Sequence, residues 1–232
     1  MKNLKEYFTD FISLAFPEVC QACGTSLYKQ EQILCTYCRQ HLPYTNFHLD
    51  RENNTAKQFW GRADIKAAAS FLYFKKGERV QHLLHQLKYR QQTEVGFYLG
   101  RLYGSILKGS QGFAEADIIC PLPLHIESLR KRGYNQSEYF AGGLAVAMEK
   151  EVDSTLLTRP EIAESQTKKS RFERFLNVRK AFSVPNPPRL DGRHVLLVDD
   201  VLTTGATLTA CALEILRVSG TRVSIATIAY AP

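Results

Sequence analysis

The chain of 232 residues is long enough for one full α/β domain with a small appendage, and its composition, 44% hydrophobic and 23% charged, is ordinary for a folded protein. The formal net charge of +7 suggests an anionic partner such as a polyphosphate or nucleic acid, although a solubilising surface would also account for it. No stretch is apolar over the roughly 18 residues that a membrane span needs. The N-terminus lacks the apolar centre of a signal peptide, so we expect a cytoplasmic protein.

Two pairs of cysteines lie near the N-terminus. They follow the segment Leu4 to Phe16, whose pattern predicts a short amphipathic helix. Cys20 and Cys23 form the first pair, and Cys35 and Cys38 form the second, eleven residues later. In a cytosolic chain this spacing predicts four thiolate ligands that close a tetrahedral, structural Zn²⁺ site. A redox CxxC motif or unconnected buried thiols are the alternatives, and two pairs this close disfavour both.

The pattern divides the chain into three parts. We expect a zinc-binding module with its N-terminal helix over residues 1–45, a polar connector over 46–65, and an α/β domain over 66–232. Alternating strands and helices predict a doubly wound, mostly parallel sheet that binds ligands beyond the carboxyl ends of its strands. Predicted strands cover 67–74, 117–121, 195–198 and 222–229, with a strand-like turn at 154–157, and predicted helices cover 78–90, 96–108, 137–149 and 208–218.

The most informative stretch begins where the predicted strand at 195–198 ends. Asp199 and Asp200 follow this strand directly, and a loop of small residues separates them from the next helix. Backbone N–H groups and hydroxyls in such a loop can surround a phosphate at the helix N-terminus, while the carboxylates can accept hydrogen bonds from ribose hydroxyls. An ordinary capped turn would not explain the doubled aspartate. The loop residues are Thr203, Thr204, Gly205, Ala206 and Thr207.

A second anion-binding element is expected where the strand at 117–121 ends in a Pro-Leu-Pro-Leu turn. The basic segment Arg130 to Gln136 follows, in which Gly133 permits close backbone approach and Arg132 can fork onto phosphate oxygens. A solvated helix face is the alternative interpretation of the Lys/Arg triplet at 130–132. Its place next to the turn favours the anion site.

The block around Asp199 and Asp200 resembles the phosphoribosyl-pyrophosphate (PRPP) signature of type I phosphoribosyltransferases. In order along the chain, the motifs together resemble the ComF (ComFC/GntX-like) family. The shared elements are the four cysteines, Leu87-Lys-Tyr-Arg90, the Pro-Leu-Pro turn, Arg130-x-Arg-Gly-Tyr-Asn-Gln136, Gln166-Thr167, Arg174-x-x-Asn177, Ala181-Phe182 and Val198-Asp-Asp-Val-Leu-Thr-Thr-Gly205.

This resemblance implies a type I phosphoribosyltransferase-like fold that binds PRPP together with Mg²⁺. It places the ribose on Asp199 and Asp200, and the 5′-phosphate on the loop 203–207. It places the pyrophosphate near Leu122, Pro123 and Leu124, with Lys88 and Arg132 as helpers. A mobile hood would correspond to residues 166–179, unless these form an exposed polar loop; its cations are Lys168, Lys169, Arg171 and Arg174.

Two functions follow from the resemblance. One is Mg²⁺-dependent transfer of phosphoribose from PRPP to an unidentified acceptor. The resemblance implies a role for this reaction in DNA uptake and natural transformation, with other DNA-uptake proteins as partners. Where many purine-salvage enzymes carry a carboxylate base, this chain has Thr203, which disfavours 6-oxopurines. The other is a non-enzymatic, PRPP-responsive protein that binds single-stranded DNA through its basic clusters and through Tyr134, Phe172 and Phe175. The sequence identifies no catalytic residue.

Overall fold

The structure, a computed structural model, describes residues 17–159 and 182–232. The predicted helix at Leu4 to Phe16 and the predicted hood at 166–179 lie outside the described residues.

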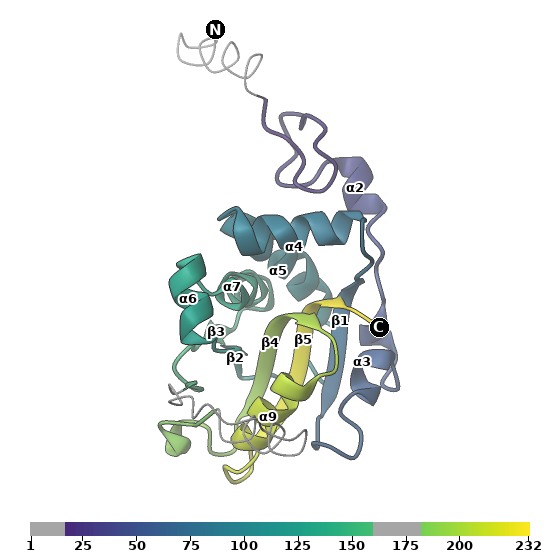
Figure 1. Ribbon diagram of the computed structural model, residues 1–232. Helices are drawn as coiled ribbons and strands as arrows, with labels where there is room; N and C mark the ends of the chain where they lie inside the picture. The colour runs from purple at the N-terminus through teal and green to yellow at the C-terminus, as the bar shows by residue number, and fades with distance from the viewer. Residues whose placement is uncertain (1–16, 160–181) are drawn as a thin grey trace, which may run out of the picture.

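Five strands form one parallel sheet in the order β1-β5-β4-β2-β3, which confirms the predicted fold class. The two longest, β4 and β5, are central and carry near-continuous buried runs, as expected for strands covered on both faces. Figure 1 shows the strands side by side across the picture. The strands are β1 (Ala67–Tyr73), β2 (Ile118–Pro121), β3 (Glu151–Val152), β4 (His194–Leu202) and β5 (Arg222–Tyr230).

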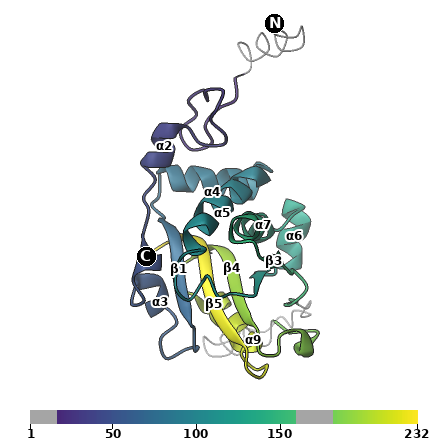
Figure 2. The ribbon, with the colours of Figure 1, turned by 180° about the vertical axis from the view of Figure 1, so that it is seen from behind.

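Helices cover both faces of this sheet. The connections from β1 to β2 and from β2 to β3 run one way across the sheet and the connection from β4 to β5 runs the other way, so right-handed crossovers place their helices on opposite faces. Figures 1 and 2 show α9 on one face and the pair α5 and α7 on the other. The connections that leave the neighbouring strands β2 and β4 therefore run in opposite directions across the sheet. A doubly wound sheet binds its ligand at such a switch point. The helices of this domain are α4 (Arg79–Tyr89), α5 (Thr93–Leu107), α6 (Ile126–Arg132), α7 (Gln136–Met148) and α9 (Ala206–Ile215), with a short turn η2 (Pro187–Arg189).

Helices α5 and α7 cross with their backbones in contact. A Cβ atom at Gly143 would lie 2.0 Å from the carbonyl oxygen of Phe97, and one at Gly100 would lie 2.3 Å from the carbonyl oxygen of Phe140. Glycine costs up to about 1 kcal/mol in a helix interior. The close approach explains why both helices contain glycine despite that cost.

The N-terminal part of the chain packs onto the same body. It contains α2 (Thr36–Gln40), η1 (Phe47–Leu49) and α3 (Asn54–Lys57). In Figure 1, α2 lies above α4, and α3 lies beside β1. The expected connector is more ordered than a linker. The buried Asn53 side chain donates to the carbonyls of Phe47, Asp50 and Ala68, and its Oδ1 caps α3.

Several boundaries differ from those predicted. The predicted strand-like segment at 154–157 is a turn, and the edge strand β3 precedes it. Strand β4 extends through both aspartates to Leu202, because Asp199 pairs with Thr227 in the β4–β5 ladder. Helix α6 was not predicted, since its buried face is too small to leave an apolar period.

Among residues 17–159 and 182–232, no helix combines the length and apolar character that a membrane crossing requires.

The helix crossing can be tested at two neighbouring glycines. We expect Gly143→Ala to destabilise the protein by about 3 kcal/mol, because the added methyl group meets backbone that cannot move aside. Gly142→Ala is the matched control: its Cβ would lie 3.6 Å from the Phe97 ring, an ordinary contact, and it should be neutral or stabilising. Urea unfolding of both variants provides the measurement. Equal stabilities would contradict the close crossing.

Candidate functional site

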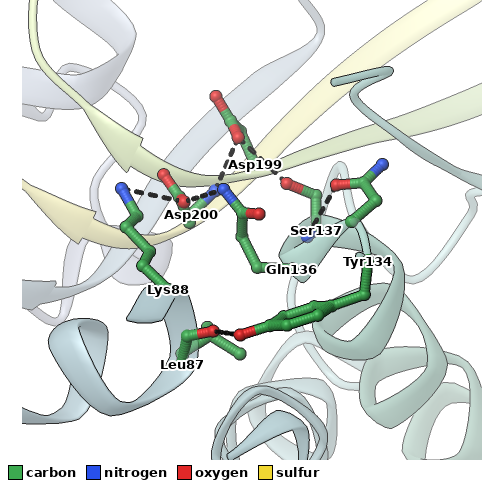
Figure 3. Close-up of polar contacts among 8 residues, drawn as sticks. Leu87, Lys88, Tyr134, Gln136, Ser137, Asp199 and Asp200 are labelled. Atoms are coloured by element: carbon green, nitrogen blue, oxygen red, sulfur yellow. Dashed lines mark hydrogen bonds and ion pairs between the residues drawn. The ribbon is translucent and has the colours of Figure 1, made fainter. Parts of the chain in front are cut away.

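The two aspartates lie near the end of β4, opposite the C-terminal end of α4 and the first turn of α7 (Figure 3). Asp200 is 6% exposed, and its Oδ2 accepts from Lys88 Nζ at 2.9 Å and from Gln136 Nε2 at 2.8 Å. Asp199 is partly exposed, and its Oδ1 accepts from Ser137 Oγ at 3.0 Å and from the Asp200 backbone N–H at 2.8 Å. The two carboxylates are thus held by different partners.

Asp199 has a perturbed pKa. Burial raises its pKa to about 7, and the negative charge of Asp200 acts in the same direction. The hydrogen bonds from Asp200 and Ser137 and the charge of Lys88 oppose this rise. Asp199 is therefore a carboxyl group whose charge state is balanced near neutral pH. A ligand that brings hydroxyl donors or a cation would favour its ionised form.

The segment Tyr134 to Ser137 connects the pieces of the site. The Tyr134 hydroxyl donates to the carbonyl oxygen of Leu87 at the end of α4 (Figure 3). Asn135 donates to the carbonyl oxygen of Leu122 at 3.0 Å and caps α7 by accepting from the backbone of Ser137. With Gln136 on Asp200 and Ser137 on Asp199, four consecutive residues fix four different points.

The predicted pyrophosphate turn lies beside the aspartates. Pro121 pairs with Val198 in the β2–β4 ladder, and the Leu122 N–H donates to the carbonyl oxygen of Val198 at 2.9 Å. The turn therefore begins one strand away from Asp199. Pro123 and Leu124 follow it, half-buried, before α6 begins.

The predicted phosphate loop is the turn from β4 into α9. Thr203 and Thr204 are exposed, Gly205 is the N-cap with φ of 69°, and Ala206 and Thr207 form the first turn of the helix. The N-cap has no side chain, so it offers no acceptor to the first N–H groups of α9, which suits an anion at this end.

The connector supports this loop from behind, a role that the sequence did not indicate. Arg62 Nη1 donates to the carbonyl oxygens of Thr204 and Gln58, each at 2.8 Å. A Cβ atom at Gly205 would lie 3.4 Å from the buried ring of Phe59. The segment around α3 therefore forms the outer wall of the loop.

Lys88 contacts β4, and Arg132 contacts the end of α4. Lys88 reaches Asp200, whereas the Arg132 guanidinium lies 5.6 Å from the centre of the Tyr89 ring. Both line a cavity between the ends of α4 and α6. The structure therefore brings Lys88 to Asp200. Arg132 lines the same cavity as Lys88.

The four N-terminal cysteines come together as one cluster that could hold a metal ion. Their Sγ atoms all lie within 4.8 Å of one another, and Cys23 Sγ and Cys35 Sγ are 3.8 Å apart. Tetrahedral zinc with Zn–S bonds of about 2.3 Å requires sulfurs about 3.8 Å apart, so the set fits. Hydrogen bonding with Thr25 lowers the pKa of Cys23 to about 6, which favours the thiolate that binds metals.

Sequence reasoning missed Gln136, Ser137, Asn135 and Arg62. The first three belong to the segment that drew attention as an anion site, but the basic residues were weighed there rather than the amides and the hydroxyl. Arg62 bonds to residues 4 and 142 positions away, and only the former could be anticipated locally.

The sequence is similar to those of known proteins. Residues 136–232, which begin at Gln136 and include both aspartates, match the phosphoribosyl transferase domain family. The DNA utilization protein YhgH of Escherichia coli is 30% identical over 203 residues, covering 86% of this chain and 84% of the relative. Competence protein F of Haemophilus influenzae is 26% identical over 200 residues, covering 82% and 86%. The chain belongs to the ComF family.

Solved phosphoribosyltransferase structures are more distant. The glutamine PRPP amidotransferase of Bacillus subtilis aligns with a TM-score of 0.44 and 18% identity over 62% of this chain, which spans 30% of the amidotransferase chain. An adenine phosphoribosyltransferase of Thermoanaerobacter pseudethanolicus aligns with a TM-score of 0.38 and 17% identity, covering 67% of this chain and 90% of the enzyme. Likeness at this level carries no functional argument, and the family assignment depends on the sequence matches.

The support from the connector can be tested with Arg62→Ala. Loss of the bond to Thr204 should weaken binding of ribose 5-phosphate or PRPP about two- to tenfold, because the loop loses its outer tie. Pyrophosphate, which lacks the 5′-phosphate, should bind as before. Arg51→Ala, an exposed change in the same segment, is the control for calorimetric titration. A loss shared equally by all ligands would point to unfolding instead.

Proposed function

We propose that the protein binds PRPP with Mg²⁺ in the crevice between β2 and β4 and acts on it in DNA utilisation or natural transformation. The observation that carries this proposal is the pair Asp199 and Asp200, held ready by Lys88, Gln136 and Ser137 between a phosphate-sized loop and a second turn. In the proposed pose the ribose lies on the aspartates and the 5′-phosphate on residues 203–207. The pyrophosphate lies near residues 122–124, with Lys88 and Arg132 as neighbouring cations.

The acid pair suits a magnesium-bound sugar diphosphate. Carboxylate oxygens are preferred ligands of Mg²⁺, which usually reaches such sites bound largely to substrate phosphates. Asp199 and Asp200 would hold this ion or the ribose hydroxyls beside it, and the ion would neutralise the leaving pyrophosphate. Lys88 and Gln136 both bind Oδ2 of Asp200, so Oδ1 can accept from a ligand while the ion pair persists. A ligand that replaces Lys88 on Oδ2 would free its ammonium for a neighbouring anion.

The reaction class that fits these residues is transfer of phosphoribose from PRPP to an acceptor. At the position of the usual purine base-binding carboxylate stands Thr203, which is exposed and cannot act as a general base at neutral pH. Catalysis would then depend on stabilising the pyrophosphate as it leaves, rather than on activating the acceptor. This favours an acceptor that is already nucleophilic.

The acid pair provides the direct test. Asp200→Asn and Asp199→Asn should each weaken PRPP binding about five- to a hundredfold, because each removes a negative charge and replaces one acceptor oxygen by an NH2 group, a loss of roughly 1–3 kcal/mol. Asp191→Asn, an exposed change before β4, is the control. Calorimetric titration with PRPP and Mg²⁺ measures the effect. Unchanged affinity in both variants would remove the proposal.

We also propose that the metal of the cysteine cluster is zinc in a structural role. Four cysteines leave no open position for a substrate, which is typical of structural sites. Three of the four are buried, and the cluster packs toward α4, where His82 Nδ1 lies 3.2 Å from the carbonyl oxygen of Ala22. Arg79 lies over the ring of Tyr37 in α2.

The four-cysteine site predicts the zinc content of the protein. The purified protein should contain about one Zn²⁺ per chain, and Cys38→Ser should lose it, because one thiolate fewer opens the site. Cys211→Ala, which removes a buried thiol outside the cluster, should keep the metal. Elemental analysis measures both. Zinc-free wild-type protein with four reactive thiols would contradict the assignment.

A second candidate is a non-enzymatic protein that binds single-stranded DNA in response to PRPP. The net charge of +7 and the names of the relatives favour it. If the strand binds through its phosphates, the logarithm of affinity should fall with that of salt by about 0.7 per phosphate neutralised. Fluorescence anisotropy with an oligothymidylate, with and without PRPP, measures this. Absence of binding at low salt would rule out the DNA-binding candidate, and the phosphoribosyl transfer would remain.

A further inference from the structure

A cavity of about 210 Å³ lies between the carboxyl ends of α4 and α6, next to the acid pair. Lys88 separates it from the aspartates: its side chain lines the cavity, and its ammonium reaches Asp200 at 2.9 Å. No carboxylate is among the described residues that line it. These residues are Lys88, Tyr89, Gln91, Lys131, Arg132 and Tyr134.

Basic residues at the end of one helix need no ligand to explain them, because the helix dipole favours cations there. Here, however, cations from two helices converge on one cavity. Lys88 comes from α4, and Lys131 and Arg132 come from α6. Lys131 and Arg132 face no carboxylate in the lining, and Lys88 shares its charge with Asp200, so the cavity has a positive potential that a phosphate would relieve.

An aromatic ring of the lining contacts one of these cations, Arg132. The Tyr89 ring is 59% exposed and lies between the His85 ring, at 5.2 Å, and the Arg132 guanidinium, at 5.6 Å. The opposite wall, Tyr134, is fixed by its hydrogen bond to Leu87. A guanidinium fixed on a ring presents its planar fork in one orientation, which suits the oxygens of a phosphate.

We infer that this cavity binds the phosphate group of a second ligand, distinct from PRPP, and that this ligand is the phosphate-bearing acceptor. The role as acceptor rests on the proposed function, whereas the binding of a phosphate does not. A ligand anchored here lies against Lys88 and hence one side chain away from Asp200. Its phosphate is a monoester in a free nucleotide and a diester in a nucleic-acid strand.

The test uses AMP as the probe, adenosine as its phosphate-free match, and the full chain saturated with PRPP and Mg²⁺. We expect AMP to bind this complex and adenosine not to bind it. Lys131→Ala and Tyr89→Ala should each weaken AMP about tenfold, since one removes a cation and the other the ring that orients Arg132. Tyr89→Phe and Lys66→Ala, the latter before β1 at the opposite edge of the sheet, should bind AMP normally.

The outcomes separate the possibilities. An oligothymidylate that is weakened by the same two variants, when AMP does not bind, assigns the cavity to the diester of a strand. AMP that binds only by displacing PRPP, or that is unaffected by both variants, overturns the inference. If PRPP itself fails to bind, the proposed function fails. AMP binding to the PRPP-free protein, sensitive to Lys131 and Tyr89, would still support the phosphate site.

Discussion

Two adjacent carboxylates at the end of a buried strand repel each other and lose their hydration, and the structure around them is arranged to offset both costs. A cation and an amide hold Asp200, while a hydroxyl and a backbone N–H hold Asp199. The three side-chain donors come from two helices that are far apart in sequence, α4 and α7. The site therefore exists only if both helices are held at one distance from β4.

That distance is set by the way in which the helices pack. Helix α7 carries Gln136 and Ser137 at its first turn, and its glycine face meets the backbone of α5 at a separation that no side chain would permit. Helix α5 follows α4 after a short turn, so the same contact also positions Lys88. The polar site and the crossing of the helices are thus parts of one arrangement, in which the small residues place the charged ones.

The sequence predicted much of this fold because its strongest signals were local. The apolar runs of the main strands, the helical spacing of Val80 to Leu87 and the doubled aspartate are all visible within a few residues. Contacts between distant segments were not predictable in this way. Three such contacts depend on the tertiary structure. They are the ion pair of Lys88 with Asp200, the hydrogen bond from Arg62 to the carbonyl oxygen of Thr204, and the close approach of the α5 backbone to Gly143. Glycine weakens a helical sequence pattern, yet at Gly143 the packing requires it.

Lys88 has one ammonium group and two possible neighbours for it. While it is paired with Asp200, its charge is largely spent on that carboxylate. A ligand that takes over Asp200 releases this charge toward the space between α4 and α6, and an anion held there draws the lysine away from Asp200. By thermodynamic linkage each event favours the other to the same extent. Lys88 alone would then couple ligand binding at Asp200 to anion binding between α4 and α6, without any movement of the sheet.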